Sequence, residues 1–324
     1  MTILVTGAAG FIGYHLCEAL LARGDKVLGI DNLNDYYDPK LKEARLARLR
    51  VRNGFSFQKI DIADREAMER LAADHQDIER IANLAAQAGV RHSLKHPRDY
   101  VHANLTGFLE ILELARGLPR LAHLVYASSS SVYGANTKLP FAIEDPTDRP
   151  LALYGATKKA NEGMAYSYSH LYRIPATGLR FFTVYGPWGR PDMSAMIFAR
   201  AILTGEEITV YNQGEMKRDF TYVDDIVDGI VAALDHPPSG DGAPHRIYNL
   251  GNHSSEPLMR FIGVIEHACG KKARIKFAPM QDGDVPETYA DIEASTRDLG
   301  FMPRTSIDVG IPRLVTWFRD YYRM

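Results

Sequence analysis

Short apolar and β-branched runs alternate with longer helical patterns through the first half of the chain. This alternation is typical of βαβ units around a parallel sheet. The predicted strands are Thr2–Thr6, Lys26–Ile30, Phe55–Ile60, Glu79–Leu84, Leu121–Ala127 and Ala176–Leu179. The predicted helices are Phe11–Ala22, Pro39–Val51, Arg65–Asp74, Pro97–Arg116 and Tyr154–Tyr172. We interpret Glu79–Leu84 and Leu121–Ala127, which are mainly apolar runs, as central strands covered on both faces, which predicts a doubly wound (Rossmann) α/β sheet.

The pattern becomes less regular after about Phe181, where proline and glycine cluster between shorter elements. We therefore divide the chain into a Rossmann domain at 1–180 and a smaller mixed α/β lobe at 181–324. The predicted elements of this lobe include strands Ile208–Tyr211 and Ile247–Leu250 and helix Asp225–Leu234. Because that helix is apolar enough to pack on the first domain, we expect residues of about 220–250 to be interleaved with it.

Composition excludes several classes of protein. The 324 residues are 46% hydrophobic and 24% charged, which is typical of a compact soluble protein. The net charge of −2 is spread without long blocks, so we expect neither nucleic acid nor a membrane as partner. No run reaches the roughly 18 apolar residues of a membrane span, and we expect a cytosolic location. Cys17 and Cys269 stand far apart, which predicts neither a disulfide nor a cysteine metal site.

A glycine-rich turn follows the first predicted strand and opens the first predicted helix, with glycines at 7, 10 and 13. The first glycine permits the tight turn, the second lets a pyrophosphate approach the backbone, and the third allows close packing of helix on strand. Free N–H groups at the helix start would then face the phosphates. The context predicts a dinucleotide site.

Two acidic residues follow later strands in the positions that such a site needs. Asp31 ends the second strand, where a carboxylate accepts from the ribose hydroxyls and repels a 2′-phosphate, so NAD is favoured over NADP. The alternative is a surface aspartate in a turn. Asp61 with Ile62 follows the third strand and could bracket the adenine, or Asp61 could be the N-cap of the next helix.

Tyr154 and Lys158 are four residues apart and therefore project from one face of a helix. A phenol acts as a base at neutral pH only where a neighbouring cation lowers its pKa, and Lys158 would supply that cation. The same spacing recurs at Tyr36 and Lys40, which we interpret as surface. Tyr154 differs because a run of four serines, 128–131, stands at the carboxyl end of the fifth strand, where ligands bind in such sheets.

These motifs together carry a resemblance to a known family. The chain resembles the extended short-chain dehydrogenase/reductases over nearly its whole length, through GAAGFIG, Asp31, NLAAQAGVR, ASSSSVYG, YGATK and RDFTYVDD in the family order. It is most similar to the UDP-glucuronate 4-epimerases within that family. The resemblance implies a homodimer formed through the helices Pro97–Arg116 and Tyr154–Tyr172.

The resemblance also implies roles for individual residues. Ser129 would be the third catalytic residue beside Tyr154 and Lys158, assisted by other serines of the run such as Ser128 and Ser130. The cofactor contacts that it implies are Gly7, Gly10, Phe11, Ile12, Gly13, Asp31, Asn32, Asp61, Ile62, Leu84, Ala85, Ala86, Asn104, Tyr154, Lys158 and Phe181.

The substrate end involves the second half of the chain. Arg190 stands in a Gly/Pro-rich loop, where its guanidinium could pair with a sugar carboxylate or simply be solvated. The resemblance favours the first reading. It further implies that Arg218 holds a phosphate, that Tyr211 stacks on uracil rather than packing as a core aromatic, and that Gln281 and Asp284 close over the diphosphate.

The chain departs from the wider family pattern at three positions. Asn83 replaces a histidine of many relatives, and Gln281 stands where relatives often have arginine, which leaves more of the phosphate charge to Arg218. Galactose-type relatives have asparagine where this chain has Thr183, whereas the glucuronate type has threonine.

The predicted function is 4-epimerisation of UDP-glucuronate to UDP-galacturonate through a transient 4-keto sugar, with tightly bound NAD. Three alternatives stay open at this point. They are a UDP-glucose/galactose 4-epimerase, a UDP-glucuronate decarboxylase passing through the same ketone, and a non-catalytic NAD-binding regulator on the same fold.

Overall fold

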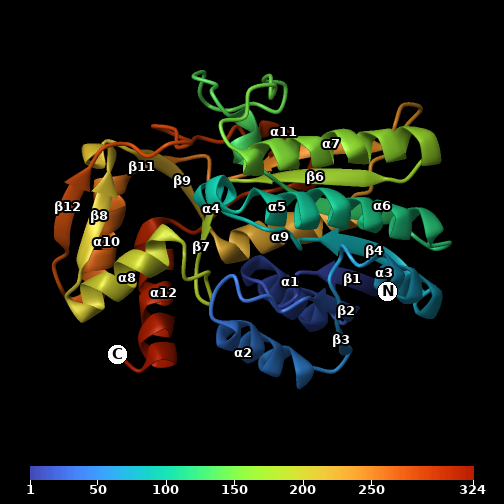
Figure 1. The fold of residues 1–324 in the computed structure, drawn as a ribbon, viewed down its shortest axis with the longest axis horizontal. Coiled ribbons are helices and arrows are strands. Elements are labelled where there is room, and N and C mark those ends of the chain that lie inside the picture. The colour runs from blue at the N-terminus through green and yellow to red at the C-terminus, as the bar shows by residue number, and fades with distance from the viewer.

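A computed structural model describes residues 1–324, and its main feature is a seven-stranded parallel sheet (Figure 1). The strand order is β10-β6-β5-β4-β1-β2-β3. The strands are β1 (Thr2–Thr6), β2 (Lys26–Asp31), β3 (Phe55–Lys59), β4 (Ile78–Asn83), β5 (His123–Ser129), β6 (Ala176–Phe181) and β10 (His245–Leu250). Because the chain runs from β1 outward to β3 and then returns to the other side of β1, the order reverses between β1 and β4. Ligands of such sheets bind beyond the carboxyl ends of the strands at this reversal.

Helices cover both faces of this sheet, as the doubly wound prediction requires. Ile3 and Val5 of β1 pack in one core with α1 (Phe11–Arg23), α2 (Pro39–Arg50), α9 (Val223–Asp235) and α11 (Glu293–Leu299). Leu4, between them, packs in a second core with α3 (Arg65–Asp74), α6 (Gly107–Gly117) and α7 (Leu153–Tyr172). Alternate side chains of one strand thus enter opposite layers. None of the helices combines the length and the apolar character that crossing a membrane would require.

One predicted helix is interrupted. Pro97–Arg116 was expected to be continuous, but it is divided into α5 (Pro97–Tyr100), the π-helix η1 (Val101–Thr106) and α6. The wider turn of η1 holds Asn104 in the interior, where its amide accepts from the Gln87 backbone N–H at 2.8 Å and donates to the Gln87 carbonyl at 3.0 Å. A further helix, α4 (Val90–Lys95), lies just before α5 in the chain and was not predicted, because it is only six residues long.

Two strands end later than predicted. We expected strands to end at Ala127 and Leu179, whereas β5 continues to Ser129 and β6 to Phe181, since Ser128 pairs with Arg180 and Ser129 with Phe181. Pairing between neighbouring strands therefore overrides the polar character of the two serines. The result is that a serine and a phenylalanine with predicted site roles stand on adjacent strand ends.

The remaining elements form a second lobe with two small sheets. Its strands are β7 (Thr183–Tyr185), β8 (Glu207–Tyr211), β9 (Lys217–Tyr222), β11 (Ser255–Pro257) and β12 (Arg274–Ala278). Its helices are α8 (Ser194–Thr204), α10 (Leu258–Cys269) and α12 (Ile307–Tyr322), and it contains the short turn η3 (Asn212–Gly214). Another short turn, η2 (Ser130–Tyr133), belongs to the first lobe, where it follows β5. Phe220 and Phe261 stack at its centre with ring centroids 3.8 Å apart. Between these elements the chain returns to the first lobe, where α9 packs on α1 and β10 pairs with β6.

A buried ion pair fastens α7 to the large sheet. The Arg180 Nε atom lies 2.8 Å from Glu162 Oε1, and Nη2 lies 3.0 Å from Oε2. Ser128 donates to the same carboxylate at 2.7 Å. Burial alone would raise the pKa of Glu162, but Arg180 and the Ser128 hydroxyl hold it below the ordinary value. The ion pair thus joins α7 to β6 through side chains that are only 4 to 5% exposed, and the Ser128 hydroxyl adds β5 to the same cluster.

Glu162→Gln should destabilise the protein strongly, because it keeps the side-chain shape but leaves the Arg180 charge buried without a counter-ion. We expect a loss of about 3–5 kcal/mol at pH 7, measured by urea unfolding. A carboxylate with a lowered folded pKa contributes stability above its unfolded pKa of roughly 4.3 and loses it as the pH falls. The difference between wild type and variant should therefore shrink in acid.

The matched control is Glu69→Gln, which removes a carboxylate that pairs with Arg65 on the exposed surface of α3. We expect no measurable change from it. Equal unfolding midpoints for the Glu162 variant and this control would contradict the role given to the buried pair.

Candidate active site

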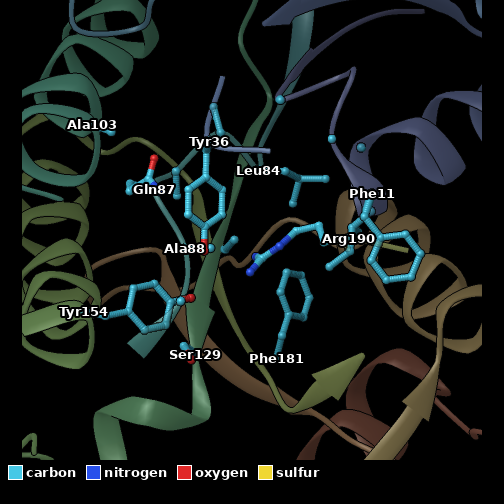
Figure 2. Close-up of a pocket in the computed structure, with 18 of the residues that line it drawn as sticks. Phe11, Tyr36, Leu84, Gln87, Ala88, Ala103, Ser129, Tyr154, Phe181 and Arg190 are labelled. Atoms are coloured by element: carbon cyan, nitrogen blue, oxygen red, sulfur yellow. The ribbon is translucent and has the colours of Figure 1, made fainter. Parts of the chain in front are cut away.

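A cavity of about 400 Å³ lies beyond the carboxyl ends of the strands at the reversal of the strand order (Figure 2). The predicted cofactor and substrate residues that line it are Gly7, Gly10, Phe11, Ile12, Gly13, Asp31, Asn32, Asp61, Ile62, Leu84, Ala85, Ala86, Ser128, Ser129, Ser130, Tyr154, Lys158, Phe181, Thr183 and Arg190. The others do not line it: Asn104, Tyr211, Arg218, Gln281 and Asp284. Residues from both lobes therefore meet in one cavity.

The glycine turn between β1 and α1 leaves room that no other residue type would leave. Gly7 has φ +69°, and the Gly10 N–H donates to the Gly7 carbonyl at 2.8 Å. A Cβ atom at Gly13 would stand 2.1 Å from that carbonyl oxygen, so a side chain there would force the turn apart. The open backbone at the start of α1 is the cradle that a dinucleotide pyrophosphate occupies in this kind of fold.

Asp31 is buried at the end of β2 and is not the surface turn residue that the sequence left open. It is 8% exposed and accepts from the backbone N–H groups of Ala9 at 3.2 Å and Leu33 at 2.8 Å. These bonds fix the carboxylate at the wall of the cavity. Each of its oxygens keeps a further lone pair that can accept from a ribose hydroxyl.

The two interpretations of Asp61 are also separated. Asp64, not Asp61, is the N-cap of α3, since its side chain accepts from the Ala67 N–H. Asp61 instead accepts from Asn32 Nδ2 at 3.1 Å and from the Ala63 N–H at 2.9 Å, and it lines the cavity. The N-cap interpretation was therefore wrong.

Tyr154 points from α7 toward the cavity centre, with Ser129 close to its hydroxyl (Figure 2). Burial raises the pKa of Tyr154, while the hydrogen bond to Ser129 and the nearby Arg190 charge lower it. The Ser129 oxygen accepts a hydrogen bond from the Ser131 N–H at 3.1 Å. That bond uses a lone pair of the oxygen, so the hydroxyl proton of Ser129 remains to be donated. Ser128, by contrast, donates its hydroxyl proton to Glu162 at 2.7 Å.

The role of Lys158 beside Tyr154 stays a prediction, and the structure shows where its ammonium lies. Its ammonium donates to the Ala127 carbonyl at 2.9 Å, and burial lowers its pKa to about 8. The charge of Arg190, from the loop between β7 and α8, lies close enough to lower the pKa of Tyr154. The spacing of the motif correctly places both residues in the cavity, but the carbonyl at the end of β5 determines where the ammonium lies.

Arg190 reaches into the cavity between Tyr36 and Phe181 (Figure 2). Asp192 holds its guanidinium through two hydrogen bonds, from Nε at 3.1 Å and from Nη2 at 2.6 Å. Tyr36 donates to the same carboxylate at 2.9 Å, and its ring lies 5.9 Å from the guanidinium carbon. Arg190 Nη1 has no hydrogen bond within the protein and is therefore available for a ligand.

Tyr36 corrects the expectation that the second Tyr-x-x-x-Lys motif is surface. Lys40 is exposed, but Tyr36 lines the cavity, where burial and the charge of Asp192 raise its pKa to about 12. Sequence reasoning also missed Asp192, although its position two residues after Arg190 was a usable signal. Gln87, in NLAAQAGVR, is a further lining residue that was not singled out.

The residues outside the cavity form two groups. Asn104 lies behind the wall and positions Gln87, as described above. Tyr211, Arg218 and Asp284 gather around Arg91 of α4, which was not predicted to have a role. Gln281 is near Asp284 in the chain, and its Oε1 atom is buried without a hydrogen-bond partner.

A family match, related sequences and a related crystal structure all indicate the same family for this chain. Residues 3–251 match the NAD dependent epimerase/dehydratase family. A probable UDP-glucuronate 4-epimerase of Rhizobium meliloti is 46% identical over 100% of this chain and 98% of its own length. UDP-glucuronate 4-epimerase 4 of Arabidopsis thaliana is 46% identical over 99% of this chain and 76% of its own. The crystal structure of a Bacillus cereus UDP-glucuronic acid 4-epimerase with UDP-glucuronic acid and NAD superposes with a TM-score of 0.91, at 34% identity, over 99% of this chain and 100% of that one.

Proposed function

The chain belongs to the NAD-dependent epimerase/dehydratase family, and from this premise we propose that it interconverts UDP-glucuronate and UDP-galacturonate by epimerisation at C4. The observation that carries the proposal is the position of Arg190, a cation with a free Nη1 atom in the same cavity as Tyr154 and Ser129. A cavity that places a fixed positive charge near the base suits a sugar that carries a carboxylate. The relatives with this activity support the same conclusion.

Tyr154 and Ser129 would carry the proton chemistry. The Tyr154 phenolate takes the proton from the C4 hydroxyl, while Ser129 donates a hydrogen bond to the same oxygen. When bound, NAD supplies a carrier that accepts the C4 hydrogen and returns it to the opposite face of the ketone, so no net redox change results. The nearby Arg190 charge favours the phenolate form of Tyr154 against the effect of burial.

The cofactor would lie along the carboxyl ends of the strands. Gly7 and Gly10 present the open backbone to its pyrophosphate, and Asp31 accepts from its adenosine ribose, which favours NAD over NADP. We assign Lys158 to the cofactor as well, because its ammonium is held at the end of β5 beside the serine run. Its pKa of about 8 leaves it mainly protonated at neutral pH.

Arg190 and Thr183 would hold the sugar carboxylate. Oxidation of glucuronate at C4 gives a β-keto acid, which loses carbon dioxide when its carboxylate bond aligns with the carbonyl π system. A carboxylate gripped away from that alignment survives until the ketone is reduced. Arg190 is suited to this because Asp192 fixes its guanidinium on one edge and leaves Nη1 for the substrate.

We also propose that the chain forms a homodimer through α6 and α7. These helices carry large apolar side chains on the surface, with exposed fractions of 38% for Leu109, 54% for Tyr166, 63% for Leu171 and 45% for Tyr172. Apolar groups gathered on adjacent helices are typical of a surface that a second copy covers.

The cytosolic location stays a prediction from the sequence.

Tyr154→Phe should abolish epimerisation, because it keeps the ring and removes the proton acceptor. We expect the turnover of UDP-glucuronate to fall about 10²-fold or more, followed by NMR of the sugar. Tyr168→Phe removes a phenol from the same helix that donates to Glu113 outside the cavity, and it should leave turnover unchanged. A Tyr154 variant as active as this control would overturn the assignment of the base.

Arg190→Ala should weaken the binding of UDP-glucuronate and leave any activity on neutral UDP-sugars unchanged. The variant loses a charge-assisted contact worth roughly 1.5–3 kcal/mol, or about 10- to 150-fold in binding of UDP-glucuronate. Any activity on UDP-glucose should survive, since that sugar has no carboxylate. A 4-keto pentose, formed by loss of carbon dioxide, is expected in the variant and not in the wild type.

Arg200→Ala serves as the control, because Arg200 is an exposed arginine of the neighbouring helix α8. Equal losses of the Arg190 variant on both sugars would mean that Arg190 only supports its loop. A wild type that prefers UDP-glucose would overturn the proposed substrate.

A further inference from the structure

Arg45, in the middle of α2, binds the loop that leads to Arg190. This loop follows β7 of the second lobe and passes beside α2, which belongs to the first lobe (Figure 1). The Nη2 atom of Arg45 donates to the Trp188 carbonyl at 2.5 Å and lies 3.4 Å from the Gly189 carbonyl. Because these two residues come immediately before Arg190, the backbone that leads into this side chain is held by the first lobe.

The other branch of the same guanidinium binds the glycine turn of the cofactor site. The Nη1 atom of Arg45 donates to the Ala9 carbonyl at 2.9 Å and to the Tyr37 hydroxyl at 2.7 Å. Ala9 lies in the turn between β1 and α1, and its N–H donates to Asp31. One side chain therefore spans from the turn that would hold the NAD pyrophosphate to the loop that carries Arg190.

The burial of Arg45 points to a role in geometry rather than in stability. Its side chain is 0% exposed, and its four hydrogen bonds all go to uncharged carbonyl or hydroxyl oxygens. Its Nε atom is buried without a hydrogen-bond partner. A cation buried without a counter-ion costs free energy that neutral partners repay only in part. What the guanidinium provides in return is a rigid fork that can bind two segments at once.

The loop needs such a contact because it bends at Trp188 in an unfavourable backbone conformation. Trp188 has φ +60°, in the left-handed region that residues with a Cβ atom rarely adopt. Its ring packs against Tyr14 of α1 and Trp317 of α12, with ring centroids 5.6 and 5.2 Å away. The preceding Pro187 carbonyl oxygen lies 2.9 Å from Nε2 of His15. A conformation of this kind persists only where its surroundings impose it, and the guanidinium binds the carbonyl of the bend itself.

We infer that Arg45 is a positioning residue of the sugar site, which holds the bend at Trp188 against the glycine turn and thereby sets where Arg190 enters the cavity. Asp192 orients the Arg190 guanidinium, whereas Arg45 fixes the backbone from which that side chain extends. The inference rests on the proposed function, because it takes the sugar carboxylate as the ligand of Arg190. A loop released from Arg45 would bring the guanidinium to the carboxylate with poorer alignment, and a neutral sugar would not register the change.

The test is calorimetric titration of NAD-loaded protein with UDP-glucuronate and, separately, with UDP-glucose, in a Tyr154→Phe background that prevents turnover. Arg45→Met replaces the fork by an unbranched apolar side chain. It should weaken UDP-glucuronate binding about 10-fold and UDP-glucose binding less than about twofold, because only the acidic sugar uses Arg190. Arg45→Lys keeps the buried charge without the fork and should show the same selective loss to a smaller extent. The control Arg50→Met, at an exposed position of α2, should change neither titration.

A double variant separates positioning from a general loss of packing. In protein that already carries Arg190→Ala, the further change Arg45→Met should weaken UDP-glucuronate binding no more, because no guanidinium is left to position. Two residues that act through one contact are non-additive in this way, whereas independent effects add.

Three results would overturn the inference: unchanged UDP-glucuronate affinity in Arg45→Met, equal losses for the two sugars, or losses that add in the double variant. Retained NAD and an unchanged melting temperature show that a variant is folded, and if Arg45→Met does not fold, the same comparisons apply to Arg45→Lys. Loss of NAD from both variants would mean that Arg45 serves only the cofactor turn, which would also contradict the inference. A Tyr154→Phe parent that binds UDP-glucuronate no more tightly than UDP-glucose would instead count against the proposed function.

Discussion

The ion pair between Glu162 and Arg180 fixes the spatial relation on which the chemistry depends. It joins the helix that carries Tyr154 to the strand that ends at Phe181, and Ser128 extends the same cluster to the strand that ends at Ser129. Arg180 and Ser128 both donate to the buried Glu162 carboxylate, so a shift of α7 or β6 alone would leave a charge unpaired and a shift of β5 would break a buried hydrogen bond. The base, its serine partner and the phenylalanine at the cofactor site are thereby held as one unit.

Beside this unit, a cation of the cavity wall is held in place by a carboxylate. Asp192 orients Arg190 at the sugar end of the cavity. Two hydrogen bonds to Asp192 fix the Arg190 guanidinium, so this cation is positioned before the anion arrives and does not have to be ordered on binding. The same arrangement explains why an acidic sugar fits where a neutral one leaves Arg190 without a partner.

Local patterns in the sequence predicted most of the fold, and contacts between distant residues account for what they missed. The strands and the glycine turn follow from short runs of apolar residues and from three glycines. The bond from Tyr36 to Asp192 spans 156 positions and the pair Arg91–Asp284 spans 193, so no spacing rule reveals them. The contact of the Lys158 ammonium could not be predicted for a similar reason, because the Ala127 carbonyl that binds it lies on β5, 31 positions away in the chain. The π-helical turn at Asn104 likewise depends on Gln87, which lies outside the helix.

The central claim is that the hydrogen at C4 leaves and returns within a closed site while Tyr154 handles only the hydroxyl proton. Incubation of the NAD-loaded wild type with UDP-glucuronate in D₂O, followed by proton NMR of the product, tests this most directly. The account predicts UDP-galacturonate that retains protium at C4. Deuterium at C4 would show that the hydrogen exchanges with solvent, and the absence of any 4-epimer would show that this sugar is not the substrate; either result would contradict the account.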